Sequence, residues 1–414
     1  MRASLVLLYC SPESHIHFRC IFHLSDATSN KDRFMFKKKS ALQYRTVTVV
    51  IVLICSGLIS HLSGCAAVNP YYDASKPHHT EQGFKNNYSG PVSKSFFDFL
   101  KWQIHRIWND LPPAPQTPTP VVSADLAFIG SNAKAGANMQ PAVTWIGHAS
   151  TLVQASGLNV LTDPVFSQRA SMFASVGPIR TQAPGLSLAQ LPKIDVVLIS
   201  HNHFDHLDIN SVVALAKQAG GSPQFIVPLG VKPWMEKLGI SKVHEMDWWG
   251  SLMVGKVEFM LTPVQHWSAR GITDRSQTLW GGWAVFGPDF QWYFSGDTGY
   301  THDFIDTKTR FASRQTQAQG GGFDLALIAV GAYEPRWFMR EQHVNPAEAI
   351  QIHQELGAKR SMGVHWGTFN LTDEPLDQAP KDLALARQAA HLTENDFFLL
   401  AVGETRKLPV RSFP

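Results

Sequence analysis

The stretch that decides the fold is Ser200-His201-Asn202-His203-Phe204-Asp205-His206, which follows the apolar run from Ile194 to Ile199. It places three histidines and an aspartate within six residues. A strand that ends in a tight loop lets alternate side chains converge, so His201 and His203 can bind one metal ion. Asp205 and His206 then reach a second ion beside it. A solvated, histidine-rich turn is the alternative interpretation, and residues further along the chain favour the metal site.

A site for two metal ions needs more donors than these four, because each ion takes three or four ligands and a carboxylate often bridges them. Three later residues offer such donors: His266 after the run 257–261, Asp297 after 292–294 and His365 after 361–364. Taken singly, each is more typical of a structural histidine or a turn aspartate. Each also follows a strand-like run, and loops at one edge of a sheet converge. Their order and context therefore predict that all seven donors meet.

These residues resemble the metallo-β-lactamase superfamily, whose pattern is His-x-His-x-Asp-His followed by a histidine, a bridging aspartate and a final histidine. Further segments narrow the resemblance to the N-acyl-phosphatidylethanolamine-hydrolysing phospholipase D branch, although families of this kind vary most in substrate. The segments that carry it extend over most of the chain from Ala142 to the C-terminus and are Trp145-Ile146-Gly147-His148-Ala149, Leu161-Thr162-Asp163-Pro164-Val165-Phe166, Asp247-Trp248-Trp249, Gln265-His266-Trp267, Gly296-Asp297-Thr298-Gly299-Tyr300, 331–339 and His365-Trp366-Gly367-Thr368-Phe369.

The predicted fold is layered α/β. Strands rich in Val, Ile and Leu alternate with helical stretches such as 208–218 and 345–356, and the second stretch is entered through Asn345-Pro346 as cap and first turn. The resemblance implies the four-layer αβ/βα sandwich of the metallo-β-lactamases, with the metal site at one sheet edge. We expect residues 122–414 to form this catalytic domain. All four cysteines lie within the first 65 residues, so its site is built from imidazole and carboxylate without thiolate.

The N-terminal 64 residues are predicted to be an export signal. The basic cluster 37–39 precedes the apolar run 47–59 and the box Leu62-Ser63-Gly64-Cys65, which is similar to a bacterial lipoprotein signal. That class is cut before the cysteine, so we expect a cell-envelope protein anchored in a membrane through a lipidated Cys65. A single spanning anchor is the alternative, although the apolar run is short for it. We also hypothesise a start at Met35, which makes residues 1–34 an over-extended start.

Charge argues against a nucleic-acid partner. The signal region holds eight of the basic and three of the acidic residues, so the net charge of +3 becomes about −2 without it.

Residues 65–121 are predicted to be a tether with an amphipathic segment at 96–108 and a proline-rich linker at 111–120. Segment 96–108 is either a helix that contacts the membrane or one that covers a face of the core. Its many aromatic residues favour the core.

The resemblance implies two zinc ions, although histidine and aspartate ligands also accept iron or manganese. We assign His201, His203 and His266 to one ion, and Asp205, His206 and His365 to the other. A water shared by two cations has a pKa near neutrality and supplies a hydroxide that attacks a phosphoryl group. Asp297 is predicted to bridge the ions and to accept the proton of that water.

Residues around the metals have predicted roles of their own. Asp163 is expected to orient a ligand imidazole, and His148 either does the same or is a buried structural histidine. Segment 341–344 matches the place where the family binds substrate, so Gln342 and His343 are predicted to hold it and His343 to protonate the leaving alkoxide. The alternative for His343 is a cap on the helix near Pro346. Five aromatic residues belong either to the core or to an acyl-chain groove, namely Trp248, Trp249, Trp267, Trp337 and Phe338.

We predict a phosphodiesterase of phospholipase D type that releases an N-acylethanolamine and a phosphatidic acid. Asp297, Asp205 and His343 are its predicted catalytic residues, and Gln342, His343 and Phe204 its predicted substrate contacts. Phe204 stands where mammalian-type members are expected to have tyrosine, which leaves the exact N-acyl specificity open. A hydrolase of another ester or of a lactone is one alternative, and a non-catalytic metal-containing surface lipoprotein is another. Seven donors argue against the latter, because structural zinc is normally satisfied by four.

Overall fold

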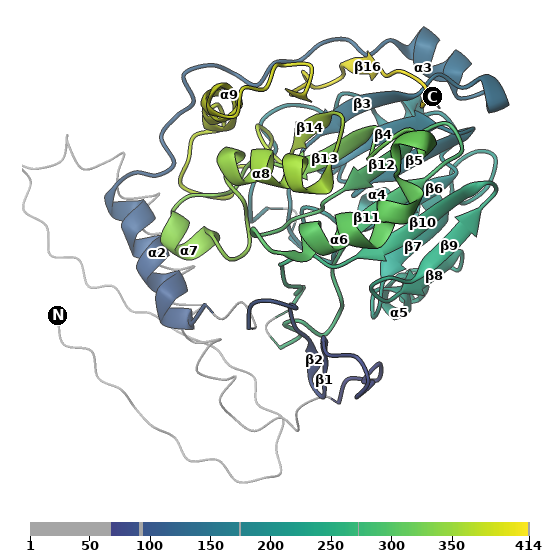
Figure 1. The fold of residues 1–414 in the computed structure, drawn as a ribbon. Coiled ribbons are helices and arrows are strands. Elements are labelled where there is room, and N and C mark those ends of the chain that lie inside the picture. Colours follow the sequence, from purple (N-terminus) through teal and green to yellow (C-terminus); the bar gives the residue numbers. More distant parts are fainter. Residues whose placement is uncertain (1–67, 91–93, 174, 272, 413–414) are drawn as a thin grey trace, which may run out of the picture. The chain divides into compact units, whose positions relative to one another are not determined.

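The computed structural model describes residues 68–90, 94–173, 175–271 and 273–412. They all belong to the unit Ser63–Pro414 (Figure 1). The predicted export signal and Cys65 lie outside the described residues. In the described part of the chain, no helix combines the length and the apolar character that crossing a membrane requires.

Two seven-stranded sheets form the centre of this unit. The first has the order β16-β3-β4-β5-β6-β7-β8 and the second β15-β14-β13-β12-β11-β10-β9. The strands of the first sheet are β3 (Ala142–Gly147), β4 (Ser150–Ala155), β5 (Leu158–Thr162), β6 (Val196–Leu198), β7 (Gln224–Pro228), β8 (Val243–Met246) and β16 (Thr405–Lys407). Those of the second are β9 (Ser251–Val254), β10 (Val257–Thr262), β11 (Gly282–Phe286), β12 (Gln291–Phe294), β13 (Leu325–Ala329), β14 (Ser361–Val364) and β15 (Phe397–Phe398).

Each sheet changes from antiparallel to parallel pairing along its width. In the first sheet β3, β4 and β5 pair antiparallel, whereas β5, β6, β7 and β8 pair parallel. In the second sheet β9 to β12 are antiparallel and β12 to β15 are parallel. Because parallel strands end at the same edge, the loops that follow β5, β6, β12 and β14 can meet there.

The strands are buried on both faces, which makes four layers. In β6 the side chains of Val196 and Leu198 pack in the core between the sheets, while Val197 packs in a second core on the outer face. The helices α3 (Leu126–Asn132), α4 (Ile209–Ala216) and α5 (Lys232–Lys237) supply residues to that outer core. The helices α6 (Asp303–Phe311), α8 (Pro346–Leu356) and α9 (Gln378–Ala389) cover the second sheet (Figure 1). The predicted αβ/βα sandwich is confirmed.

Helix α8 begins and ends where the sequence predicts. The side chain of Asn345 accepts a hydrogen bond from the backbone of Glu348, Pro346 occupies the first turn, and Gly357 closes the helix in the left-handed conformation. His343 therefore does not cap this helix, and that alternative for it is wrong.

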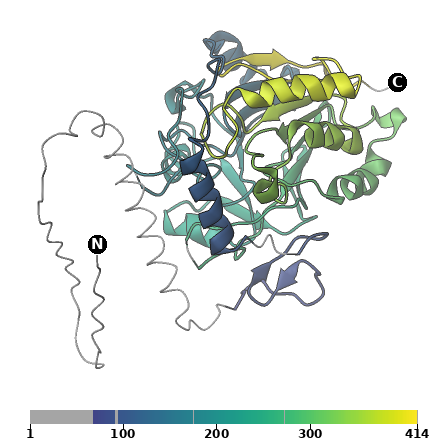
Figure 2. The same cartoon turned by 90° about the vertical axis from the view of Figure 1, so that its left-hand side faces the viewer.

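The segment before the sheets packs against the sandwich. It contains a short hairpin of β1 (His79–Thr80) and β2 (Gly83–Phe84) and the helix α2 (Phe96–Trp108), which faces the viewer in Figure 2. A capping box formed by Ser95 and Asp98 starts α2. The ring of Trp102 stacks on Phe338 of α7 (Arg336–Met339) at 4.8 Å, and its indole donates to Asp373 at 2.9 Å. The predicted helix thus packs on one face of the catalytic unit through the side that carries Trp102.

Candidate metal centre

The loop after β6, residues 201–207, is the ligand loop. His201 Nε2 lies 2.8 Å from His203 Nδ1, and His266 Nε2 from the loop after β10 lies 3.3 Å from the same nitrogen. His201 and His266 are buried. Three imidazoles therefore converge on one point, and they are the three assigned from the sequence to the first metal ion.

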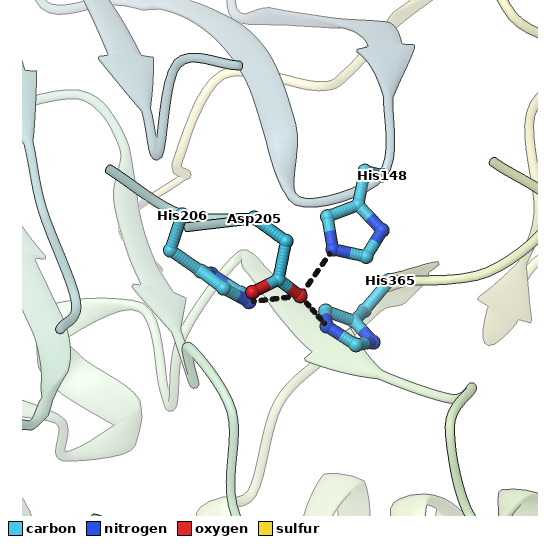
Figure 3. Close-up of side chains that lie close together, drawn as sticks. All are labelled: His148, Asp205, His206 and His365. Atoms are coloured by element: carbon cyan, nitrogen blue, oxygen red, sulfur yellow. Dashed lines mark hydrogen bonds and ion pairs between the residues drawn. The ribbon is translucent and has the colours of Figure 1, made fainter. Parts of the chain in front are cut away.

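A second group surrounds the carboxylate of Asp205 (Figure 3). Its Oδ2 lies 3.0 Å from His148 Nε2, 3.3 Å from His365 Nε2 and 3.5 Å from His206 Nε2. His148 comes from the turn between β3 and β4, whereas His365 follows β14. The structure thus brings together the three residues assigned to the second ion and adds His148 to them.

Asp297 lies between the two groups. Its Oδ2 is 3.1 Å from His206 Nε2 and 3.2 Å from His365 Nε2, and 3.9 Å from the Nε2 atoms of both His201 and His266. The carboxylate is buried in the loop after β12. This is the position expected of a bridging ligand, and the other six predicted donors lie around it.

The hydrogen bonds of the histidines fit a pair of cations. His266 Nδ1 lies 3.0 Å from the carbonyl of Gln342, and His206 Nδ1 lies 2.7 Å from Asp163 Oδ2. Because these partners only accept, each Nδ1 carries a proton, and each Nε2 is the nitrogen that faces the cluster. His203 Nε2, His206 Nε2 and Asp297 Oδ1 are buried without a hydrogen-bond partner among the described residues. Buried nitrogen and oxygen atoms without a hydrogen-bond partner are typical of metal ligands, because a metal ion is their partner.

The charges of the two groups differ. Burial lowers the pKa of both His203 and His266 to about 3, so the first group is neutral. Burial opposes a charge on His365 as well, but attraction to Asp297 and Asp205 outweighs it and raises the pKa of His365 to about 9. The pKa of His206 is raised well above its ordinary value in the same way. The second group therefore binds protons more tightly than the first.

Asp163 has the position predicted for a residue that orients ligands. It is fully buried at the end of β5, and its carboxylate accepts from Ser200 as well as from His206. Ser200 Oγ in turn lies 2.9 Å from His201 Nδ1. One carboxylate therefore orients a histidine of each group.

His148 holds the second group with its main chain too. Its carbonyl accepts from the indole of Trp145 at 2.9 Å and from the amide of His365 at 3.0 Å. Its φ of 54° lies in the left-handed region, which is costly for a residue other than glycine. Of the two interpretations drawn from the sequence, a residue that orients ligands fits this geometry better.

A cavity of about 460 Å³ opens onto the metal centre. The predicted substrate contacts Phe204, Gln342 and His343 all line it. His343 Nδ1 lies 3.8 Å from Asp297 Oδ2, and the side chain of Gln342 contacts Met339. Several residues that line this cavity were not predicted from the sequence, because they come from distant segments that meet only in the folded chain. They are Lys94, Phe99, Arg275 and Leu371.

The five aromatic residues of the expected acyl-chain groove lie in different environments. Trp267 and Phe338 line the cavity. Trp248 donates its indole to the carbonyl of Trp280 and belongs to the core, and Trp249 packs against that core. Trp337 is 47% exposed. The groove interpretation is therefore wrong for Trp248 and Trp249, because the first is part of the core and the second packs against it.

A family model described as "Beta-lactamase superfamily domain" matches residues 158–366. The chain belongs to the metallo-β-lactamase superfamily. The Caenorhabditis elegans N-acyl-phosphatidylethanolamine-hydrolyzing phospholipase D 1 is 39% identical over 277 residues, which cover 63% of this chain and 74% of that protein. The mitochondrial protein of the same name from Saccharomyces cerevisiae is 38% identical over 238 residues, or 56% of this chain and 48% of its own. The superfamily member described here thus falls in the branch that the sequence predicts.

A solved structure has the same fold. The possible metal-dependent hydrolase from Veillonella parvula superposes with a TM-score of 0.50 at 18% identity and covers 65% of this chain and all of its own. This superfamily member is accordingly a metal-dependent hydrolase with histidine and aspartate clusters that suit metal ions.

Proposed function

We propose that the protein is a zinc-dependent phosphodiesterase of phospholipase D type. Its substrate is N-acyl-phosphatidylethanolamine or a related phospholipid, and its products are an N-acylethanolamine and a phosphatidic acid. The observation that carries this proposal is the cavity that joins the metal centre to an apolar wall. The names of the relatives in C. elegans and yeast support the same substrate class.

The cavity suits an amphipathic lipid. At its inner end lie His203, Asp205 and Asp297, beside the polar side chains of Gln342 and His343. Its outer wall is apolar and is supplied by α2 and α7, whose lining residues are Phe99, Trp102, Phe338 and Met339. A phosphate at the inner end would leave its acyl chains along this wall, because apolar surface is stabilised by about 25 cal/mol per Å² removed from water.

Two zinc ions held by the seven donors would supply Lewis acidity toward the phosphate and lower the pKa of a water molecule. Side chains carry out the proton transfers. Asp297 is ionised, because His206 and His365 hold its pKa well below the ordinary value against the effect of burial, and an ionised carboxylate at this position could accept the proton of an attacking water. Burial lowers the pKa of His343 to about 3, but an adjacent anionic phosphate raises it. His343 then passes a proton to the leaving alkoxide.

The test is lipid turnover by the purified full-length chain with zinc. Substrates are N-acylated and plain phosphatidylethanolamines, and His203→Ala is the control. Release of N-acylethanolamine by the wild type alone supports the proposal. Two bound metals without turnover of any phospholipid would contradict it and favour a lactone or another ester. In that case Gln342→Ala and His343→Ala would leave hydrolysis of the non-phosphate substrate unchanged.

We also propose that the enzyme works on a membrane surface, held there through a lipidated Cys65. Helix α2 lines the cavity with Trp102 and exposes Ile104, Ile107 and Trp108 on its outside, with Trp108 85% exposed. Co-sedimentation with phosphatidylethanolamine vesicles tests this contact. Binding should weaken in Trp108→Ser, whereas Leu385→Ser, which changes an equally apolar exposed residue on α9, should leave binding intact.

A further inference from the structure

A second cavity lies on the other side of the ligand loop. Its volume is about 480 Å³, and it shares no lining residue with the cavity over the metal centre. Segment 68–71 and helix α5 form two of its walls, and Asn202 and Leu207 of the ligand loop form a third. Cavities of this size are typical of small-molecule sites.

Arg270 connects this cavity to the ligand loop. Its guanidinium lies between the rings of Phe204 and Trp234, 4.2 and 4.6 Å from their centres. Its Nη1 donates to the carbonyl of Asn202 at 2.8 Å and to that of Leu207 at 2.7 Å. Arg270 thus holds both ends of the segment 202–207, which carries three of the metal ligands.

The guanidinium of Arg270 forms no direct ion pair with a carboxylate among the described residues, although Asp208 and Asp274 attract it through space, and Asp274 lines the same cavity. The nearby Asp274 accepts instead from the backbone amides of Arg270 and Gly271, and Asp208 is bonded to Ser167 and Ser211. The Nε and Nη2 groups of Arg270 donate to no atom of the described chain. Because neither carboxylate contacts the guanidinium, an anion bound directly to its free edge would stabilise this largely buried cation further.

Other polar groups of the cavity also lack partners. Asn202 is 5% exposed, and its Oδ1 atom, which can only accept, is buried without a hydrogen-bond partner among the described residues. Thr278 Oγ1 is likewise buried without a partner. Lys237 adds a second cation, and Pro70 and Trp234 add apolar surface. Native structures leave few buried polar groups unsatisfied, so this set points to a missing ligand.

We propose that this cavity is a second ligand site, for a small molecule whose phosphate or carboxylate group binds the free edge of Arg270. Its apolar part packs against Trp234. Because the same guanidinium holds the ligand loop, an occupant fixes Arg270 and through it the loop. The bound metals then dissociate more slowly.

Two anions show whether the site prefers a phosphate or a carboxylate group. Selenate has the shape of phosphate, and 4-bromobenzoate carries a carboxylate on an apolar ring. Crystals of the zinc-loaded full-length chain are soaked in each, and anomalous scattering locates the selenium or bromine. A peak beside Arg270 in either soak supports the site and names the group it prefers. Peaks at the metal centre alone, or an adventitious ion only, in both soaks overturn it.

Zinc loss to a chelator gives the second measurement. The preferred anion should slow it about tenfold in the wild type, as expected for one or two charge-assisted hydrogen bonds. The double variant Lys237→Ala/Thr278→Val should lose this protection, because both residues line the second cavity only. Lys232→Ala, which removes a lysine of the same helix outside the cavity, should keep it. Equal protection in all three proteins would place the effect at the metals and overturn the proposal.

Discussion

His206 and Asp163 form a fully buried pair in which Nδ1 of the histidine donates to the carboxylate over 2.7 Å. The other nitrogen of His206 faces Asp297 at 3.1 Å. Since the carboxylate of Asp163 also binds Ser200, which contacts His201, this residue directly after β5 orients ligands on both sides of the centre. It does so without being a ligand itself.

Asp163→Asn should weaken metal binding by about 10- to 100-fold, because the neutral amide no longer fixes the tautomer of His206. The dissociation constant measured by competition with a chelator checks this. Ser200→Ala is the matched control, because it removes the hydroxyl that contacts His201 and Asp163 but keeps the bond between Asp163 and His206, and it should cost less. Equal affinities in Asp163→Asn and the wild type would contradict the assigned role.

His148→Ala should reduce the metal content toward one ion per chain. The variant removes the imidazole that lies 3.0 Å from Asp205, while the group of His201, His203 and His266 stays intact (Figure 3). His148→Asn, which keeps a side-chain donor, should retain more of the second ion. Elemental analysis of the purified variants measures both. Two tightly bound ions in His148→Ala would show that the histidine is only structural.

Metal uptake should release protons, mostly from the second group. The pKa of His365 is raised to about 9 by its carboxylate neighbours despite burial, so this residue is protonated at neutral pH in the metal-free protein. His206 is protonated for the same reason. A metal ion needs both nitrogens free, so about two protons leave and affinity rises with pH toward about 9. Titration calorimetry in buffers of different ionisation enthalpy counts these protons, and His365→Ala should release about one fewer.

The first group should behave in the opposite way. The pKa of both His203 and His266 is lowered to about 3 by burial, so protons compete with the metal only under strongly acidic conditions. One ion should therefore remain bound after dialysis at about pH 5, where an ordinary imidazole with a pKa near 6.5 is protonated. Metal analysis after such dialysis checks the expectation. Loss of both ions together would contradict it.

The donors could be predicted because each follows a strand that the sequence reveals. His201, Asp297 and His365 stand directly after apolar runs, and parallel strands bring their ends to one edge whatever the rest of the chain does. The cavity wall could not be predicted in this way. Phe99 and Leu371 meet only through the packing of α2 on the sandwich, and no local pattern encodes that contact. Trp248 was ambiguous for the same reason, since an aromatic residue near a ligand loop fits a core as well as a groove.

Asp247 joins the N-terminal hairpin to the sandwich. Its carboxylate binds His78 at 2.7 Å, His79 at 3.0 Å and also Lys76. Burial alone would raise the pKa of Asp247, but hydrogen bonds from His78 and Lys76 outweigh this and hold it well below its ordinary value. The hairpin thus depends on one ionised carboxylate.

Asp247→Asn should lower the free energy of unfolding by about 2 kcal/mol at neutral pH, as expected for a partly buried ion pair that loses one charge. Because the folded pKa is depressed, the contribution of Asp247 is fully present above the unfolded pKa of about 4 and is lost as the pH falls through the folded value. The difference between wild type and variant should therefore shrink in acid. Urea unfolding at about pH 7 and pH 3 measures it. Lys76→Ala, which removes a more exposed partner, should cost less, and a difference for Asp247→Asn that does not change with pH would show that the carboxylate acts by shape alone.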